Sequence, residues 1–233
     1  FLGESVEVVQ TAPNTLDRIR DRSGAGPTGT LRIHLLPGLA GEHFAEFVGA
    51  FQLRYPKISI ELDMSDTIID PVKEGFHCSI QVFEPVSEDL VSRQLFMFHR
   101  VFCASASYLA KHGVPSHPNQ LRDHRLGLYS RYPTGTQWRF DSAGSELTIQ
   151  LEPSFQTNSV QLLRDFALAG AGVVCIPTII ACGAVSGGQL MWILKEFTLS
   201  PLSVCAVYPQ SLRGGYMLQN FLDGLVRHFK LLD

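Results

Sequence analysis

The stretch that decides the fold, residues 29–82, reads GTLRIHLLPGLAGEHFAEFVGAFQLRYPKISIELDMSDTIIDPVKEGFHCSIQV. Short apolar runs rich in Ile, Leu and Val read as strands, and the phenylalanines between the first two are spaced as on one face of a helix. Strands that alternate with helices predict a parallel sheet covered on both faces, whose ligands bind beyond the carboxyl ends of the strands. The predicted elements are strands at 30–36, 58–64 and 78–82 and helices at 39–55 and 74–76.

The composition is that of an ordinary globular protein. The chain has 233 residues, of which 45% are hydrophobic and 18% charged, with a net charge of −3 and a mean hydropathy of +0.10. This length allows one large domain or two small ones. The chain is too acidic to bind nucleic acid through phosphates, and no apolar run is long enough to span a bilayer. It starts at Phe1 without a leader-like segment, so we expect a fragment that lacks an N-terminal portion.

Five segments, in order along the chain, carry a resemblance to a known family. They are GTLRI at 29–33, FQLRYP at 51–56, EGF at 74–76, VFCASASYL at 101–109 and LAGAGVVCIP at 168–177. Together they resemble the effector-binding domain of LysR-type transcriptional regulators. The resemblance implies an α/β type 2 periplasmic-binding-protein fold, in which two Rossmann-like lobes enclose a central cleft.

The resemblance also implies how the chain is divided. Residues 1–28 are expected to be the end of a linker helix, broken at Pro13, and a flexible hinge. Residues 29–99 with 203–233 are expected to form lobe 1, and residues 100–202 to form lobe 2. In the later part of the chain, apolar patterns and turn residues predict strands at 101–104, 127–129, 137–140, 147–151, 173–176 and 203–208 and helices at 107–113, 160–169 and 216–229.

Three loops that follow strands are expected to line the cleft. Pro37 with Gly38, Ser65, and Asn158 with Ser159 each stand where a helix is expected to begin. Free backbone N–H groups and the helix dipole at such ends attract anions, so small carboxylates are natural ligands. The alternative is that these residues are ordinary helix caps.

Three cleft positions depart from what the family often carries. Gly38 stands in place of a serine or threonine, Gln81 in place of an arginine, and Phe83 in place of a glycine. A small polar anchor is lost and a large ring is gained. We therefore expect an effector that is bulkier at one end or less anionic, or a cleft that Phe83 partly fills.

Further candidates for ligand binding lie at the expected crossing between the lobes and at the edge of lobe 2. His99 is expected to hydrogen-bond the effector or tune a pH response, unless it is a surface or hinge histidine. Tyr129 ends a predicted strand, and Arg131 follows it. The arginine is expected to hold a carboxylate through two hydrogen bonds, unless it is a solvated loop residue.

Signals for catalysis or metal binding are weak. The sequence has no G-x-S-x-G, G-x-x-x-x-G-K or H-E-x-x-H motif, so we predict no catalytic residue, no metal and no cofactor. The five cysteines are odd in number and lack C-x-x-C spacing, and four lie in or beside apolar strands, which predicts buried, reduced thiols. A redox-sensing pair, as in one branch of the family, is the alternative.

The predicted function is therefore effector sensing by a cytoplasmic LysR-type regulator. The resemblance implies a small-molecule effector, an organic acid or an aromatic, that changes the geometry of a homodimer or tetramer. DNA contacts are expected only through a winged helix-turn-helix that precedes Phe1, and no membrane is involved. The alternatives are a transport-type solute-binding protein of the same fold and an enzyme built on it, for which no catalytic set is found.

Overall fold

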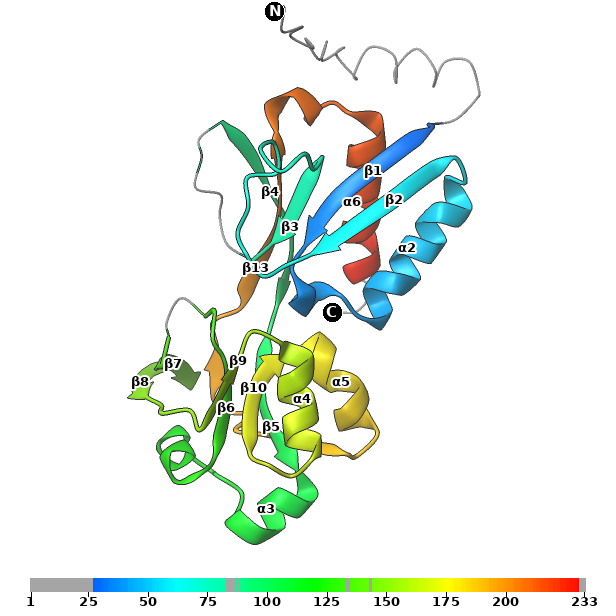
Figure 1. The fold of residues 1–233 in the computed structure, drawn as a ribbon. Coiled ribbons are helices and arrows are strands. Elements are labelled where there is room, and N and C mark those ends of the chain that lie inside the picture. The colour runs from blue at the N-terminus through cyan, green and yellow to red at the C-terminus, as the bar shows by residue number, and fades with distance from the viewer. Residues whose placement is uncertain (1–26, 83–86, 88, 133–134, 143, 231–233) are drawn as a thin grey trace, which may run out of the picture.

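The computed structural model describes residues 27–82, 87, 89–132, 135–142 and 144–230. The expected linker helix and Phe83 lie outside these residues. The described chain forms two lobes, one above the other in Figure 1, each built around its own sheet and with its own hydrophobic core. The expectation of two α/β lobes is confirmed. Among the described residues, no helix combines the length and apolar character needed to cross a membrane.

Lobe 1 is built on a mixed five-stranded sheet with helices on one face. Its elements are β1 Gly29–Leu35, the 3-10 turn η1 Pro37–Leu39, α2 Glu42–Arg54, β2 Ile58–Met64, β3 Cys78–Gln81, β4 Leu90–Phe98, β13 Leu202–Pro209, the 3-10 turn η3 Gln210–Leu212 and α6 Tyr216–Phe229. The strand order is β2-β1-β3-β13-β4. The helices α2 and α6 cover one face (Figure 1), where the rings of Phe47 and Phe221 meet with centroids 4.9 Å apart.

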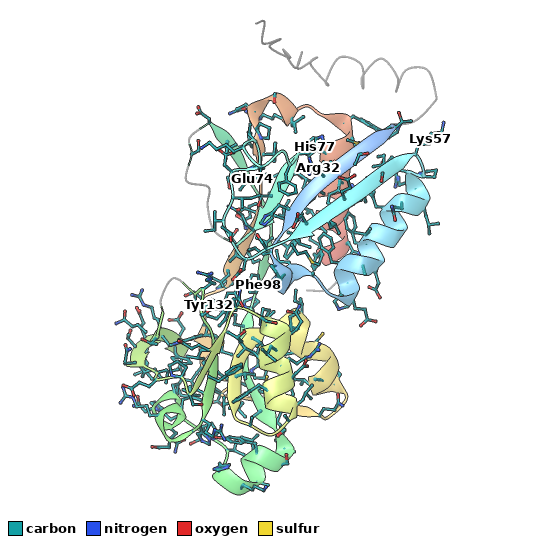
Figure 2. The ribbon with its side chains drawn as sticks, viewed as in Figure 1. Arg32, Lys57, Glu74, His77, Phe98 and Tyr132 are labelled. Carbon is teal, nitrogen blue, oxygen red and sulfur yellow. The ribbon has the colours of Figure 1, made fainter. Side chains whose placement is uncertain are left out.

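Part of the opposite face of this sheet is covered by the irregular segment 65–77. Backbone contacts fasten the segment to β1: the His77 N–H donates to the Arg32 carbonyl at 2.9 Å, and the Arg32 N–H donates to His77 Nδ1 at 3.0 Å. Figure 2 shows both side chains on this part of lobe 1. Phe76 lies beside the buried ring of His34, with centroids 5.8 Å apart. The segment therefore supplies the apolar cover that a helix was expected to provide.

The expected helix boundaries in this lobe are partly wrong. Ser65 is followed by turns, and the expected helix through residues 74–76 does not form. Gly75 adopts a left-handed φ of +73°, which ends the helical turn before it can continue. Pro37 and Gly38 form only the short turn η1, and α2 begins after it.

Lobe 2 packs its main sheet between two helices and a hairpin. Its elements are β5 Arg100–Ser105, α3 Ala106–His112, the 3-10 segment η2 Pro118–Asp123, β6 Leu126–Tyr129, β7 Gln137–Ser142, β8 Ser145–Gln150, β9 Phe155–Thr157, α4 Val160–Leu168, β10 Val173–Pro177, α5 Thr178–Ser186, β11 Leu190–Ile193 and β12 Thr198–Leu199. The main sheet has the order β11-β5-β10-β6-β9, and a second sheet has the order β12-β7-β8. Leu163 of α4 and Ala181 of α5 pack in one core. On the other side, Trp138 and Phe140 of β7 lie 5.5 and 5.6 Å from the ring of Phe102.

The parallel pairing predicted for the three strands within residues 29–82 is confirmed, since β1 pairs in parallel with β2 and with β3, but the crossing strands make both main sheets mixed. β4 of lobe 1 continues through His99 into β5 of lobe 2, and the chain returns at Leu202 as β13. These crossing strands run antiparallel to their neighbours: β13 to β3 and β4, and β5 to β10 and β11. The two crossings leave the carboxyl ends of β1 and β2 facing lobe 2 (Figure 1).

Candidate functional site

The lobes meet where the end of β1 faces the first turn of α4. The side chain of Gln161 donates hydrogen bonds to the carbonyls of Pro37 and Ala40, both at 3.1 Å. Gly38 lies against Val160, since a Cβ built on Gly38 stands 3.5 Å from a methyl group of the valine. This contact joins the two lobes across the cleft through backbone and apolar groups.

The start of α4 is capped as predicted. The Ser159 hydroxyl accepts a hydrogen bond from the Leu162 N–H at 3.1 Å, and the Ser159 N–H donates to Thr157 Oγ1 at 3.1 Å. Two of the N–H groups that were expected to attract an anion are therefore already bound within the chain. Besides Gln161, the side chain of Asn158 at this helix start reaches across the cleft to lobe 1.

Asp66 of lobe 1 bridges the cleft to Arg131 and Asn158 of lobe 2. Its Oδ2 accepts a hydrogen bond from Arg131 Nε at 3.2 Å, and the Asn158 side chain also hydrogen-bonds the carboxylate. The Asp66 side chain is 12% exposed, whereas that of Arg131 is 60% exposed. The protein thus places a carboxylate of its own on the two lobe-2 side chains that were predicted to bind a carboxylate ligand.

The electrostatics of this bridge favour an ionised Asp66. Burial by itself raises the pKa of the carboxyl group. Hydrogen bonds from Asn158 and Arg131, together with the charge of the arginine, outweigh burial and lower the pKa below its ordinary value. Asp66 is therefore an anion at neutral pH.

Behind the bridge, a chain of four polar side chains runs into lobe 1. Ser65 Oγ lies 2.9 Å from His34 Nε2, and His34 Nδ1 lies 2.9 Å from Ser79 Oγ. Ser79 in turn donates to Gln81 Oε1 at 3.0 Å. The last three side chains are buried. Burial lowers the pKa of His34, and the charge of Asp63 and a hydrogen bond with the backbone of Ser65 oppose this only in part, so the ring is neutral at pH 7.

Cavities of about 270 and 410 Å³ are lined by residues of both lobes, and a third, beside Tyr129, is small and apolar. The third cavity measures about 40 Å³, and Figure 2 shows two of its lining residues, Phe98 and Tyr132, at the junction of the lobes. Sites for small organic ligands have volumes on the order of 300–1,000 Å³. This cavity is therefore smaller than the usual site of a small organic ligand. The lining residues are Leu36, Gly38, Leu39, Val82, Phe98, Tyr129, Tyr132, Val160, Pro177 and Leu202.

Most of the residues predicted for the site lie near this contact. Gln81 lies beneath it, fully buried in β3. His99 lies apart, because its side chain lines a separate cavity of about 410 Å³ together with Trp192 and Phe229. Phe83 lies outside the described residues. Pro37, Gly38, Arg131 and Asn158 make contacts between the lobes, and Tyr129 lines the small cavity there. Ser65 and Ser159 adjoin Asp66 and Asn158 in sequence, but their hydrogen bonds stay within their own lobes.

Three further residues of the candidate site are not predicted from the sequence, His34, Ser79 and Gln161, whereas Asp66 lies in the loop 65–67 that was expected to line the cleft. His34 and Ser79 carry no local signal, because they are 45 positions apart and meet only through the pairing of β1 with β3. Gln161 is likewise defined by a contact with a turn in the other lobe.

The cysteines lie mostly in the interior of the protein. No group of three or more His, Cys, Asp or Glu side chains that suits a metal ion occurs in the described part of the chain. All five cysteines are free, and the prediction of buried thiols is confirmed for all but Cys182. Burial raises the pKa of Cys103 and of Cys175 to about 12. It raises the pKa of Cys78 as well, so these thiols are protonated at neutral pH.

Comparison with known proteins gives consistent matches. A family model described as the LysR substrate binding domain matches residues 24–230. The chain is 30% identical over 207 residues to "Uncharacterized HTH-type transcriptional regulator YhjC" of Escherichia coli (strain K12), which covers 84% of this chain and 66% of that protein. It is 24% identical over 232 residues to the HTH-type transcriptional regulator DmlR of the same strain, which covers 95% of this chain and 72% of that protein. The chain thus spans about two thirds of the length of the first relative.

Solved structures share the two-lobed fold. The regulatory domain of CrgA, a LysR-type transcriptional regulator from Neisseria meningitidis, matches with a TM-score of 0.77 at 27% identity, covering 86% of this chain and 98% of that chain. A second structure of CrgA gives a TM-score of 0.78 at 25% identity, covering 90% of this chain and 71% of that chain. The predicted type 2 periplasmic-binding-protein fold is confirmed.

Proposed function

The chain belongs to the LysR substrate-binding domain family of transcriptional regulators, and from this premise we propose that its cleft senses a small-molecule effector. The effector is an organic acid or an aromatic molecule that binds between the lobes. Its binding changes how the lobes close and, through them, how the subunits of the regulator are arranged. A ligand shifts such an equilibrium only by the difference in its affinity for the two states.

One observation carries this proposal: Asp66 bridges the lobes where a ligand has to enter. The carboxylate of lobe 1 holds Arg131 and Asn158 of lobe 2, and the cavity behind it measures only about 40 Å³. A ligand that enters the cleft has to separate these groups. Occupancy of the cleft and lobe geometry are coupled for that reason.

The bridge is weak enough for a small ligand to displace. Because Arg131 is 60% exposed, solvent screens the ion pair, and pairs of this kind contribute about 0.2–1 kcal/mol. The neighbouring hydrogen bonds of Gln161 to lobe 1 contribute about 0.5–1.5 kcal/mol each. A ligand that binds with micromolar affinity contributes roughly 8 kcal/mol. That value is already net of the contacts that the ligand breaks, so interlobe contacts of about 0.2–1.5 kcal/mol each are compatible with such an affinity.

We propose that the regulator assembles as a homodimer or tetramer through α2 of one subunit and α4 of the next. Leu53 of α2 is 86% exposed and Leu162 of α4 is 49% exposed, and Met64 on the neighbouring edge strand β2 is 54% exposed. Exposed apolar side chains of this size are typical of interfaces. Because α2 and α4 belong to different lobes, a change in lobe closure moves the two surfaces relative to each other.

In this proposal, a winged helix-turn-helix in the longer protein contacts DNA in the cytoplasm. The present chain carries a net charge of −3 and no basic patch is expected to hold phosphates, so it supplies the sensing and not the DNA contact. The regulator's target and the sign of its effect on transcription depend on the rest of the protein.

Thermal-shift screening of this chain against small organic acids and aromatics tests the proposal. An effector raises the melting temperature by mass action, and the shift should shrink in Ser65→Ala and Asn158→Ala. Ser92→Ala, an exposed change on β4 away from the cleft, is the matched control and should leave the shift intact. A stabilising ligand whose shift is unaffected by both cleft variants would rule out binding between the lobes.

A further inference from the structure

We propose that Ser65 presents only a hydrogen-bond acceptor to the cleft, so that the effector is a small aromatic molecule bearing a hydroxyl or amino group that donates to it. This inference rests on the proposed function, since it specifies the ligand of the same cleft. The direction of each hydrogen bond can be assigned in turn along the row of side chains from Gln81 through Ser79 and His34 to Ser65 at the cleft.

The first step fixes the direction of the hydrogen bonds at Ser79. Its hydroxyl donates to Gln81 Oε1 at 3.0 Å. A hydroxyl has a single proton, so the contact of 2.9 Å between Ser79 Oγ and His34 Nδ1 has to be one in which Ser79 accepts. Nδ1 of His34 therefore carries a hydrogen.

The second step carries this direction to Ser65. His34 is 2% exposed and neutral, and a neutral imidazole has one N–H, which is already assigned to Nδ1. Nε2 is then a lone pair, and Ser65 Oγ, 2.9 Å away, has to donate to it. The proton of Ser65 is committed to the interior, and only the lone pairs of its oxygen remain to face a ligand.

The third step concerns the surroundings of Ser65. The next residue, Asp66, adds a carboxylate to the same wall of the cleft. The neighbouring cavity is lined by apolar and aromatic side chains, among them Phe98, Tyr129 and Tyr132. An aromatic ring suits the apolar part of the cleft, and a donor on the ring suits the acceptors. A carboxylate placed at Ser65 would meet lone pairs and a negative charge.

The protonation of His34 is a direct test that needs no ligand. A long-range ¹H–¹⁵N spectrum of the labelled chain at pH 7.5 distinguishes the protonated from the unprotonated ring nitrogen. We expect the His34 hydrogen on Nδ1. A hydrogen on Nε2 would mean that Ser65 is free to donate, and it would overturn the inference whatever the cleft binds.

Binding of matched fragments tests the consequence. Phenol and anisole differ in the single hydrogen that can be donated, and benzoate carries an anion in place of the donor. We expect phenol to bind about fivefold or more tightly than anisole, because a buried acceptor left without a donor weakens binding. Equal affinities of phenol and anisole at the cleft would overturn the inference and leave the proposed function standing. Failure of all three fragments to perturb the cleft would count against the proposed function, while the His34 spectrum would still decide the orientation of Ser65.

A variant of the buried Ser79 tests the assignment through the position of the hydrogen on the His34 ring, which would not change if Ser79 served only for packing. Ser79→Ala removes the acceptor at Nδ1, so we expect the His34 hydrogen to shift to Nε2 and Ser65 to become a donor. The preference for phenol over anisole should then fall to about twofold or less. Ser92→Ala on the same sheet is the control and should preserve both the tautomer and the preference.

Ser65→Ala changes only the residue that faces the cleft, so it should abolish the preference for phenol without moving the His34 hydrogen from Nδ1. Retention of the preference in Ser65→Ala would refute the role of that hydroxyl.

Discussion

Replacing Asp66 with asparagine isolates the charge of the bridge between the lobes. Asparagine has nearly the shape of aspartate and keeps one oxygen that can accept a hydrogen bond. What is lost is the ion pair with Arg131, whose Nε lies 3.2 Å from Oδ2, and the charge that strengthens the hydrogen bond from Asn158. The variant therefore weakens lobe closure and leaves the packing of both lobes unchanged.

The size of the effect follows from exposure. Asp66 is 12% exposed, but Arg131 is 60% exposed, so the pair belongs with the screened surface ion pairs worth about 0.2–1 kcal/mol. A double-mutant cycle with Asp66→Asn, Arg131→Gln and the double variant, measured by urea unfolding, should give a coupling energy in this range. The coupling should shrink as salt is raised, because salt screens exposed charges. A loss at the upper end of the range would change the ratio of open to closed chains about fivefold.

A matched control separates lobe closure from general surface electrostatics. Arg139 pairs with Glu146 within the β7–β8 hairpin, and its side chain is 67% exposed, close to that of Arg131. Arg139→Gln should lower stability to a similar small extent but leave ligand affinity unchanged, whereas Asp66→Asn should alter both. A coupling energy of zero between Asp66 and Arg131, or equal effects of the two variants on ligand affinity, would refute the bridge as a latch.

Three further predictions concern packing, pH and assembly. Gly172→Ala should destabilise the protein by about 3 kcal/mol or more in urea unfolding, because the new Cβ stands 2.4 Å from the Arg125 carbonyl oxygen. The control Gly183→Ala meets open space in α5 and should stabilise the protein by about 0.5–1 kcal/mol. Similar free energies of unfolding for the two variants would contradict this packing. Since folding lowers the pKa of Asp66, its stabilising contribution is present above the ordinary pKa of about 4 and is lost as the pH falls through the lowered value. The difference in melting temperature between the chain and Asp66→Asn should therefore shrink on acidification below about pH 4, and a difference that grows would contradict this sign. Leu53→Glu should turn a dimer into a monomer in light scattering while changing stability by no more than about 0.5 kcal/mol, and unchanged assembly would exclude α2 from the interface.

Much of the fold follows from local patterns. The strands β1 and β2 and most of the helix between them are predicted because their apolar residues recur with the spacing of the structure they form. The capped start of α4 is predicted for a similar reason, since Ser159 stands where its hydroxyl meets an N–H of the next turn. In each case residues close in the sequence determine the structure.

The failures have a different physical origin. Strand β4 is not predicted because Ser92, Arg93 and Gln94 interrupt its apolar residues, and its place in the sheet comes from pairing with β13, more than a hundred positions away. α5 is apolar nearly all round and gives no periodic signal. The segment 65–77 looks helical until Gly75 turns left-handed.

In the candidate site too, local features are predicted from the sequence and contacts between distant segments are not. Ser65, Asn158 and Arg131 are found from their places after strands and at a helix start. The carboxylate that joins them across the cleft and the tautomer of His34 depend on contacts between distant segments. The hydrogen bonds of the site can therefore be predicted only when the pairing of β1 with β3 and the arrangement of the two lobes are known.

The measurement that tests the central claim most directly is a titration of the ¹⁵N-labelled chain with phenol, followed by backbone amide shifts. Binding between the lobes predicts that the largest changes fall at Ser65 and Asn158, on opposite walls of the cleft. Changes confined to the separate cavity around His99 and Trp192 would contradict sensing between the lobes. Equal changes at residue 65 and Asn158 on titration with benzene, which has no hydrogen-bond donor, would contradict a donor-selective cleft.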